Sequence, residues 1–203
     1  MNILRLTKKD FKDTAYYYKE YCGKTDVSDY EGSIEIEGNL GWVRFNGYVR
    51  AKGYIVSEAG SGIEAGEGIK AGWVIKAGEG IKAGSGIEAG SGIEAGWGIK
   101  AGEGIKAGEG IEAGEGIKAG LQIFCKGILS FSIKAFAGIC TWRSITEDEK
   151  TITCGRKEGD GVVEYGILKE LGMPNTDQKN ELLKKADELI QKAEELKSQA
   201  ENM

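Results

Sequence analysis

A single hexapeptide dominates the middle of this sequence. Isoleucine recurs every six residues from Ile63 to Ile123, and in the first ten repeats an alanine follows two positions later, with a glycine directly after it. The repeated unit is therefore x-G-I-[EK]-A-G. Any fold of this chain has to place many copies of one short unit in equivalent surroundings, and a regular stack of units meets that condition.

Each unit is expected to form a short β-strand followed by a corner. In a strand the Ile and Ala side chains point to one face and the intervening Glu or Lys points to the other. A helix is disfavoured because two glycines in six cost about 1 kcal/mol each relative to alanine. Glycine at the corners can adopt positive φ without steric cost. The sequence thus predicts a mainly β fold, a single-stranded β-solenoid (parallel β-helix) in which isoleucines stack in columns.

The number of hexads in one coil is left open between two and three. Stacking at 12 residues places opposite charges together in six of eight outward Glu/Lys pairs, and stacking at 18 does so in four of seven. Facing opposite charges gain only a few tenths of a kcal/mol. The comparison slightly favours a flattened two-sided coil, which would also place Trp73 and Trp97 on one column, over a triangular one.

Degraded copies of the unit flank the regular hexads at 61–123 and extend the expected solenoid to residues 33–172. They share an inward, outward, inward order: Ile34-Glu35-Ile36, Val43-Arg44-Phe45, Val49-Arg50-Ala51 and Ile55-Val56-Ser57 before the tract, then Ile133-Lys134-Ala135, Ile139-Cys140-Thr141 and Ile152-Thr153-Cys154 after it. Larger side chains and broken spacing are typical of terminal repeats, which have to cover the open ends.

Residues 1–32 are expected to form an N-terminal helical cap. Thr7 is a candidate N-cap, and Phe11, Ala15, Tyr18 and Cys22 follow at helical spacings before Gly23. This spacing predicts a short amphipathic helix over the first coil.

Residues 173–203 are expected to form a C-terminal amphipathic helix. Leu182, Leu189 and Leu196 alternate with alanines at spacings of four and three, which is a heptad seam. Two arrangements remain open. The helix either packs on the solenoid, or it pairs with a second copy in a coiled coil that makes the protein a homo-oligomer.

Composition argues against several functional classes. The 32 acidic and 27 basic residues are interleaved and give a net charge of −5, so neither nucleic acid nor a membrane is an expected partner. The chain has no histidine and its four cysteines form no CxxC pair, so no metal or other cofactor is expected. Neither a signal-peptide pattern nor an apolar span long enough for a bilayer occurs, and cytoplasmic localisation follows as an expectation.

The six-residue period resembles that of the left-handed β-helix acyltransferases. Their unit places a small residue two positions before the aliphatic one, whereas here alanine follows isoleucine. Those enzymes use a histidine as general base, and this chain has none. We therefore expect no enzymatic activity and no catalytic residues.

The segments "AGEGIKAG", "VRFNGYVRAKGY" and "FAGICTWR" are similar to glycine-rich hexapeptide proteins of phages and mobile elements. That resemblance implies a small non-enzymatic inhibitor of bacterial defence, such as an anti-CRISPR protein acting in the host cytoplasm.

Candidate contact residues for a protein partner come from two features. Trp73 and Trp97 interrupt an otherwise Ser or Glu position, and aromatic residues on a polar face are typical of binding hot spots; filling of corner space is the alternative. Glu147, Asp148 and Glu149 form the densest acidic cluster and are candidates for contacting a basic partner. The sequence thus predicts an interaction scaffold, with a self-assembling structural protein as the alternative.

Overall fold

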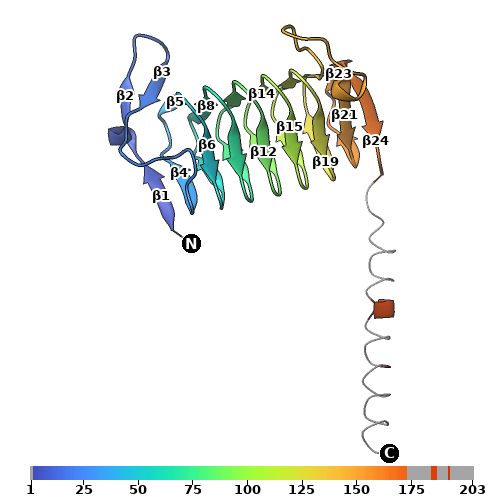
Figure 1. The fold of residues 1–203 in the computed structure, drawn as a ribbon, viewed down its shortest axis with the longest axis horizontal. Coiled ribbons are helices and arrows are strands. Elements are labelled where there is room, and N and C mark those ends of the chain that lie inside the picture. Colours follow the sequence, from blue (N-terminus) through green and yellow to red (C-terminus); the bar gives the residue numbers. More distant parts are fainter. Residues whose placement is uncertain (1, 173–183, 187–191, 193–203) are drawn as a thin grey trace, which may run out of the picture. The chain divides into compact units, whose positions relative to one another are not determined.

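The computed structural model describes residues 2–172, 184–186 and 192. Within residues 2–172 the chain winds as a parallel β-solenoid whose strands form three long sheets, named A, B and C here (Figure 1). From β4 onward, successive strands belong to sheets A, B and C in turn, and each strand pairs in parallel with the strand three places later along the chain. The predicted solenoid is confirmed.

Sheet A contains, in spatial order, β1 (Ile3–Leu6), β4 (Ser33–Ile36), β7 (Ile55–Ser57), β10 (Ile75–Ala77), β13 (Ile93–Ala95), β16 (Ile111–Ala113), β19 (Ile128–Phe131) and β22 (Arg156–Glu158). Sheet B contains β2 (Phe11–Asp13), β3 (Tyr18–Tyr21), β5 (Gly41–Phe45), β8 (Ser61–Ala65), β11 (Ile81–Ala83), β14 (Ile99–Ala101), β17 (Ile117–Ala119), β20 (Lys134–Phe136) and β23 (Val162–Tyr165). Sheet C contains β6 (Val49–Ala51), β9 (Ile69–Ala71), β12 (Ile87–Ala89), β15 (Ile105–Ala107), β18 (Ile123–Cys125), β21 (Thr151–Cys154) and β24 (Ile167–Glu170).

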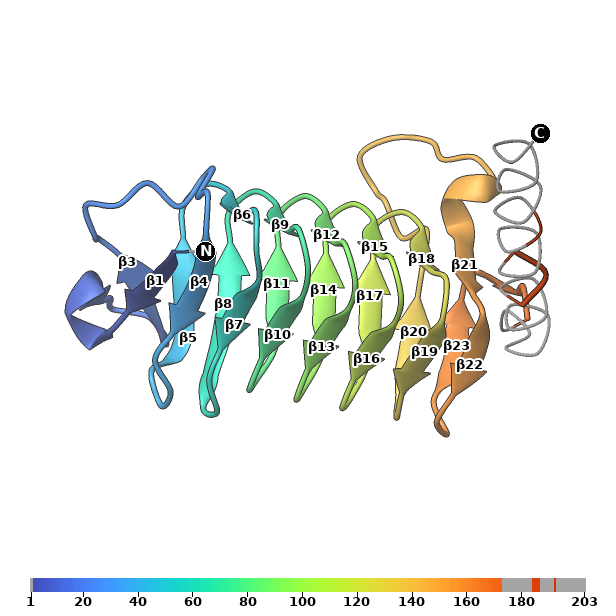
Figure 2. The ribbon, with the colours of Figure 1, turned by 90° about the horizontal axis from the view of Figure 1, so that it is seen from below.

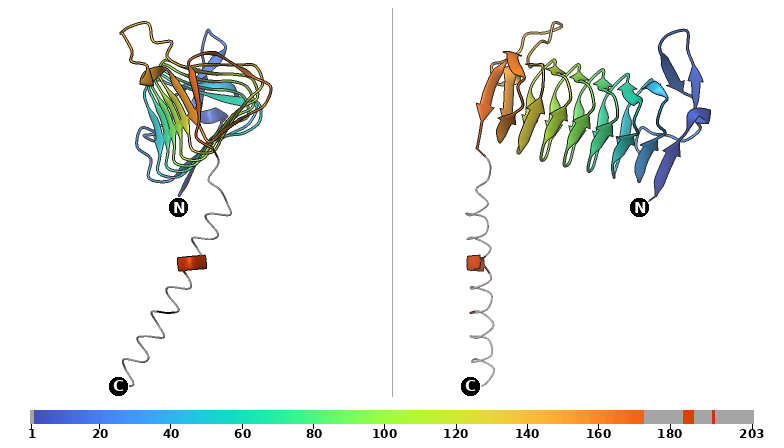
Figure 3. Two further views of the ribbon diagram at one scale, coloured as in Figure 1. Left: turned by 90° about the vertical axis from the view of Figure 1, so that its right-hand side faces the viewer. Right: turned by 180° about the vertical axis from the view of Figure 1, so that it is seen from behind.

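One coil of the regular tract contains 18 residues. Ile75 is the direct partner of Ile93, and Ile93 of Ile111, so three hexads complete each turn. Seen along its axis, the solenoid has a triangular outline (Figure 3). The slight preference for a 12-residue coil was wrong. A triangular coil brings three Ile and Ala pairs together in one layer, and burial of apolar side chains outweighs the few tenths of a kcal/mol that separate the two charge patterns.

The core is a set of parallel columns. Every isoleucine from Ile63 to Ile123 in the repeat is at most 1% exposed, and the residue two positions later, alanine in the first ten repeats and Cys125 in the last, is also buried. The Glu or Lys between them points outward, as the period of two requires. Bulkier side chains close the columns on either side of the tract, with Phe45 before it and Phe131 after it. Neighbouring coils therefore supply the apolar contacts that one hexapeptide cannot make alone.

The predicted N-terminal helix is absent from the described residues, and that prediction was wrong. Thr7 precedes only a three-residue 3₁₀ helix, η1 (Lys8–Asp10). Strands β2 and β3 then form an antiparallel hairpin in which Phe11 faces Tyr21, and both rings pack against Phe45. Aromatic side chains favour strands that pack on a sheet over an isolated helix. Strand β1 already pairs with β4, so the solenoid begins at Ile3.

The flanking triplets before the tract are confirmed as strands, but two of the three after it were misplaced. Ala135, not Ile133, is the inward partner of Ile117, and Ile133 is exposed. The chain leaves the coil after Cys140, whose backbone N–H still donates to the Gly120 carbonyl oxygen. It then runs through a loop and η2 (Asp148–Lys150) and returns at β21, where Ile152 pairs with Ile123 (Figure 2). The six-residue period from Ile123 reaches Ala135, so spacing was a better guide here than aliphatic character.

The predicted C-terminal helix falls mostly outside the described residues. Residues 184–186 and 192 have helical backbone. Leu182, Leu189 and Leu196 lie outside the described residues, so the heptad seam stays a prediction.

Candidate interaction surfaces

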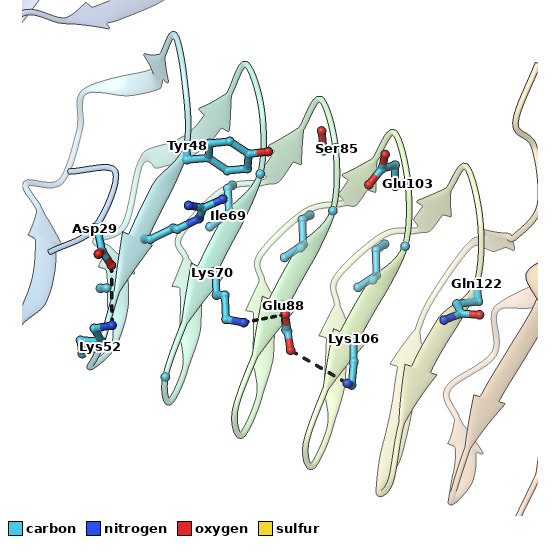
Figure 4. Close-up of a pocket in the computed structure, with 18 residues that line it drawn as sticks. Asp29, Tyr48, Lys52, Ile69, Lys70, Ser85, Glu88, Glu103, Lys106 and Gln122 are labelled. Carbon is cyan, nitrogen blue, oxygen red and sulfur yellow. Dashed lines mark hydrogen bonds and ion pairs between the residues drawn. The ribbon is translucent and has the colours of Figure 1, made fainter. Parts of the chain in front are cut away.

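The residue that precedes the isoleucine of each hexad, a glycine in all but two of them, forms a row along the outside of each sheet. On sheet C this row contains Gly68, Gly86 and Gly104, and it floors an open groove of about 720 Å³ (Figure 4). The outward Lys and Glu residues of the strands line the same groove. A smaller groove of about 390 Å³ on sheet A is lined by Gly92 and Gly110.

The two glycines of each hexad have different roles. A Cβ at Gly84, at the corner after the alanine, would lie 2.0 Å from the carbonyl oxygen of Gly66, so stacking of the coils excludes a side chain there. A Cβ at Gly86, before the isoleucine, would lie 3.3 Å from the nearest atom, and Val74 and Gln122 occupy equivalent positions. None of the repeat glycines in the described range 62–120 has positive φ. The expectation of positive φ at the corners was wrong; close approach of neighbouring coils is the reason for the corner glycines.

Charges alternate along the groove of sheet C. Lys70 Nζ lies 3.0 Å from Glu88 Oε2, and Lys106 Nζ lies 4.0 Å from Glu88 Oε1. At the N-terminal end of the groove the Arg50 guanidinium stacks over the Tyr48 ring at 3.7 Å. Most charged side chains along this face therefore already interact with other residues of the chain, and few charges remain free to attract a charged partner.

Sheet B carries an aromatic patch, defined here as Tyr16, Tyr17, Tyr18 and Trp42. The β2–β3 hairpin holds the tyrosines, and β5 holds Trp42, whose indole ring lies over Gly62 and Gly80. The four side chains enclose, with Glu64 and Lys82, a depression of about 340 Å³. Tyr17 is fully exposed and Tyr16 is 73% exposed. The sequence reasoning missed this patch because the tyrosines were assigned to a helix; read as a strand, the run of three tyrosines would have been its signal.

Trp73 and Trp97 lie at different corners of the triangle. Trp73 follows β9, at the corner from sheet C to sheet A, and Trp97 follows β13, at the corner from sheet A to sheet B. They are 54% and 48% exposed, so neither fills the core. The 18-residue coil does not bring them together, and a single contact surface built on both is not formed on one face.

Cations of the same chain lie beside each of the three acidic loop residues. Glu149 accepts hydrogen bonds from both terminal nitrogens of Arg143, at 2.6 and 3.0 Å, and from the backbone N–H of Thr146 at 3.0 Å. The Arg143 hydrogen bonds lower the pKa of Glu149 to about 2. Glu147 pairs with Lys150 at 2.8 Å, and Asp148 lies 3.7 Å from Lys169. These carboxylates hold the loop together, which weakens the case for a contact with a basic partner.

The cysteine thiols are the other side chains that could be chemically reactive. Cys125 and Cys154 are fully buried in sheet C, and burial raises the pKa of Cys125 to about 12 and that of Cys154 to about 11, so neither is a nucleophile near neutral pH. Cys22 is exposed. Among the described residues no three acidic or cysteine side chains gather as metal ligands would. The helical segments that the structure describes include none with the length and apolar character of a membrane span.

Comparisons with protein-family models, with curated proteins and with solved structures find no match.

Proposed function

We propose that the protein is a non-enzymatic scaffold that binds a protein partner through the aromatic patch. The observation that carries this proposal is the fully exposed Tyr17, which lies with Tyr16 in the turn between β2 and β3, beside Trp42 of β5. Tyrosine and tryptophan dominate binding hot spots because they bury much apolar area while offering a polar group.

The patch is organised before binding. The Tyr16 and Tyr18 rings are stacked with centroids 5.9 Å apart and planes 7° apart, and Arg44 lies over the Tyr18 ring at 5.0 Å. Rings that are already ordered lose less conformational entropy on association. Glu64 and Lys82, paired at 3.1 Å, provide a polar rim. These features favour a partner surface with an apolar protrusion that fits the depression.

A site-specific cross-linking experiment tests the patch. A photoreactive phenylalanine analogue at position 17 of the full chain is expected to label the partner in cells that produce the protein, and the product is identified by mass spectrometry. Affinity capture of that partner should fall at least tenfold in Tyr16→Ser/Tyr17→Ser. Trp142→Ser, which removes an exposed aromatic residue elsewhere, should leave capture unchanged.

The same capture assay decides the role of the corner tryptophans. If Trp73→Ser/Trp97→Ser abolishes capture at unchanged thermal stability while the tyrosine variant binds normally, the contact surface lies at the corners and the patch proposal fails. Loss of folding in the tryptophan variant would instead assign Trp73 and Trp97 to packing.

A narrower form of the proposal is inhibition of a bacterial defence complex, and only the sequence resemblance supports it. Its test is plaque formation by a phage targeted by a CRISPR system, with and without the protein; unchanged plaque numbers across representative systems would reject it.

The structural alternative is self-assembly through the C-terminal helix, favoured by the Leu182, Leu189 and Leu196 spacing alone. Light scattering on the full chain and on a chain ending at residue 174 tests it. If both chains form assemblies with the same number of copies, the seam does not hold the copies together.

A further inference from the structure

Like charges are concentrated on two of the three sheets. On sheet B, Lys100 stands between Lys82 and Lys118 as their direct partner in the parallel register. Lys82 pairs with Glu64, but within the described part of the chain Lys100 and Lys118 join no ion pair. Sheet C uses the same hexapeptide and alternates Lys70, Glu88 and Lys106 instead.

Adjacent lysines on one face of a sheet repel each other. A single substitution of Lys100 by glutamate would restore alternation, so nothing in the repeat itself requires this arrangement. Lys100 and Lys118, called the lysine column here, therefore leave an exposed row of positive charge that forms no ion pair with a described residue.

Sheet A carries the opposite charge. Glu94 is the direct partner of Glu112, and Glu94 is paired with Lys76. Glu109 and Glu112 form no ion pair among the described residues, and both line the sheet A groove. Gly92 and Gly110, which line that groove, leave room for long side chains to enter.

We propose that the lysine column of sheet B docks into the sheet A groove of a second copy of this chain. Both surfaces belong to the same solenoid and share a rung spacing of about 4.8 Å. Lys100 and Lys118 lie on successive rungs, as do Glu94 and Glu112, and Glu109 adds a second carboxylate on the rung of Glu112, so the lysines of one copy can meet carboxylates of the other in register. The contact joins two different surfaces and is therefore heterologous, which leads to a closed ring or to an open chain of copies. It uses neither the aromatic patch nor the C-terminal seam, and it goes beyond the proposed function.

Charge-swapped variants of the full chain test this contact by sedimentation velocity at low ionic strength. Wild type is expected to associate and to dissociate near 1 M salt, where the Debye length is about 3 Å. Lys100→Glu/Lys118→Glu makes both faces acidic, and Glu109→Lys/Glu112→Lys makes both basic. Each variant alone should be monomeric, and an equimolar mixture should associate again because every contact then joins opposite charges.

Three results would overturn the proposal: a monomeric wild type at low ionic strength, variants that associate as wild type does, or a mixture that stays monomeric. Circular dichroism of each variant checks that the solenoid is intact. Leu189→Lys in the full chain interrupts the predicted heptad seam and should leave this association unchanged; its loss would assign the association to the seam.

A zero-length carbodiimide cross-link locates the contact. Mixed ¹⁴N and ¹⁵N copies should yield a cross-linked peptide pair that joins Lys100 or Lys118 of one copy to Glu109 or Glu112 of the other. Cross-links confined to other lysines would contradict the assignment.

Discussion

Lys82 and Lys100 are direct partners on the adjacent strands β11 and β14, whereas the same position of sheet C pairs Lys70 with Glu88. Lys100→Glu should therefore stabilise the fold, since it replaces two repulsive contacts by two attractive ones. We expect the free energy of unfolding to rise by roughly 0.5–1 kcal/mol. Urea denaturation at low ionic strength measures the change.

Lys106→Glu is the matched control. Lys106 lies 4.0 Å from Glu88, so its reversal should lower the free energy of unfolding. Both effects should shrink at high salt because exposed charges are screened. If the free energy of unfolding rises in both variants, or in neither, the charges that face each other on neighbouring coils do not contribute to stability.

The two glycine positions should respond differently to a methyl group. Gly84→Ala places a Cβ 2.0 Å from the Gly66 carbonyl oxygen and forces two coils apart. We expect a loss of about 3 kcal/mol, at the upper end of overpacking costs. Thermal or chemical unfolding, followed by circular dichroism, gives the value.

Gly86→Ala, two residues away, is the comparison. Its Cβ would lie 3.3 Å from the Gly104 carbonyl oxygen, and the lower entropy of an unfolded chain with alanine offsets that contact. Stability should stay within about 1 kcal/mol of wild type. Equal losses at both positions would mean that the outward glycines are also required for stacking.

Stability should decline in alkali because of the buried thiols. Burial raises the pKa of Cys125 from 9.0 to about 12 and that of Cys154 from 9.0 to about 11. Their contribution is complete below pH 9 and is lost as the pH rises through the folded-state values, because the unfolded chain ionises first. Cys125→Ala/Cys154→Ala should flatten this decline, whereas Cys22→Ala should leave it unchanged.

Acid should release the loop that contains Trp142. The Arg143 hydrogen bonds lower the pKa of Glu149 from 4.5 to about 2, so the stabilisation is present above pH 4.5 and is lost as the pH falls through about 2. Trp142 fluorescence should change over that interval. In Glu149→Gln it should already differ at neutral pH, while Glu147→Gln, which keeps the Arg143 pair, should follow wild type.

Much of the solenoid could be predicted from local rules. Ile75 and Ala77 must share a face because side chains alternate in a strand, and the spacing of six repeats that arrangement in every hexad. The N-terminal segment could not be assigned in the same way. Phe11 and Tyr21 form a hairpin because Phe45, far along the chain, offers a surface to pack on, and no local spacing contains that information.

The candidate site also combines features that local sequence indicates with features that depend on contacts between distant segments. The sequence left open whether Trp73 and Trp97 are exposed or fill corner space, and their separation onto two corners depends on the length of the coil. The aromatic patch depends on Trp42 lying beside a hairpin, which joins segments that are distant in sequence.

The sequence by itself determined which side chains of each hexad are buried, because alternation along a strand and the apolar character of Ile and Ala decide that locally. Only the tertiary structure decided that three hexads close one coil, and hence that Lys100 lies beside Lys82 and Lys118 rather than beside glutamates. The physical reason is one of scale. Charge pairs on the surface differ by tenths of a kcal/mol, whereas closing the triangle buries three columns of isoleucine at once.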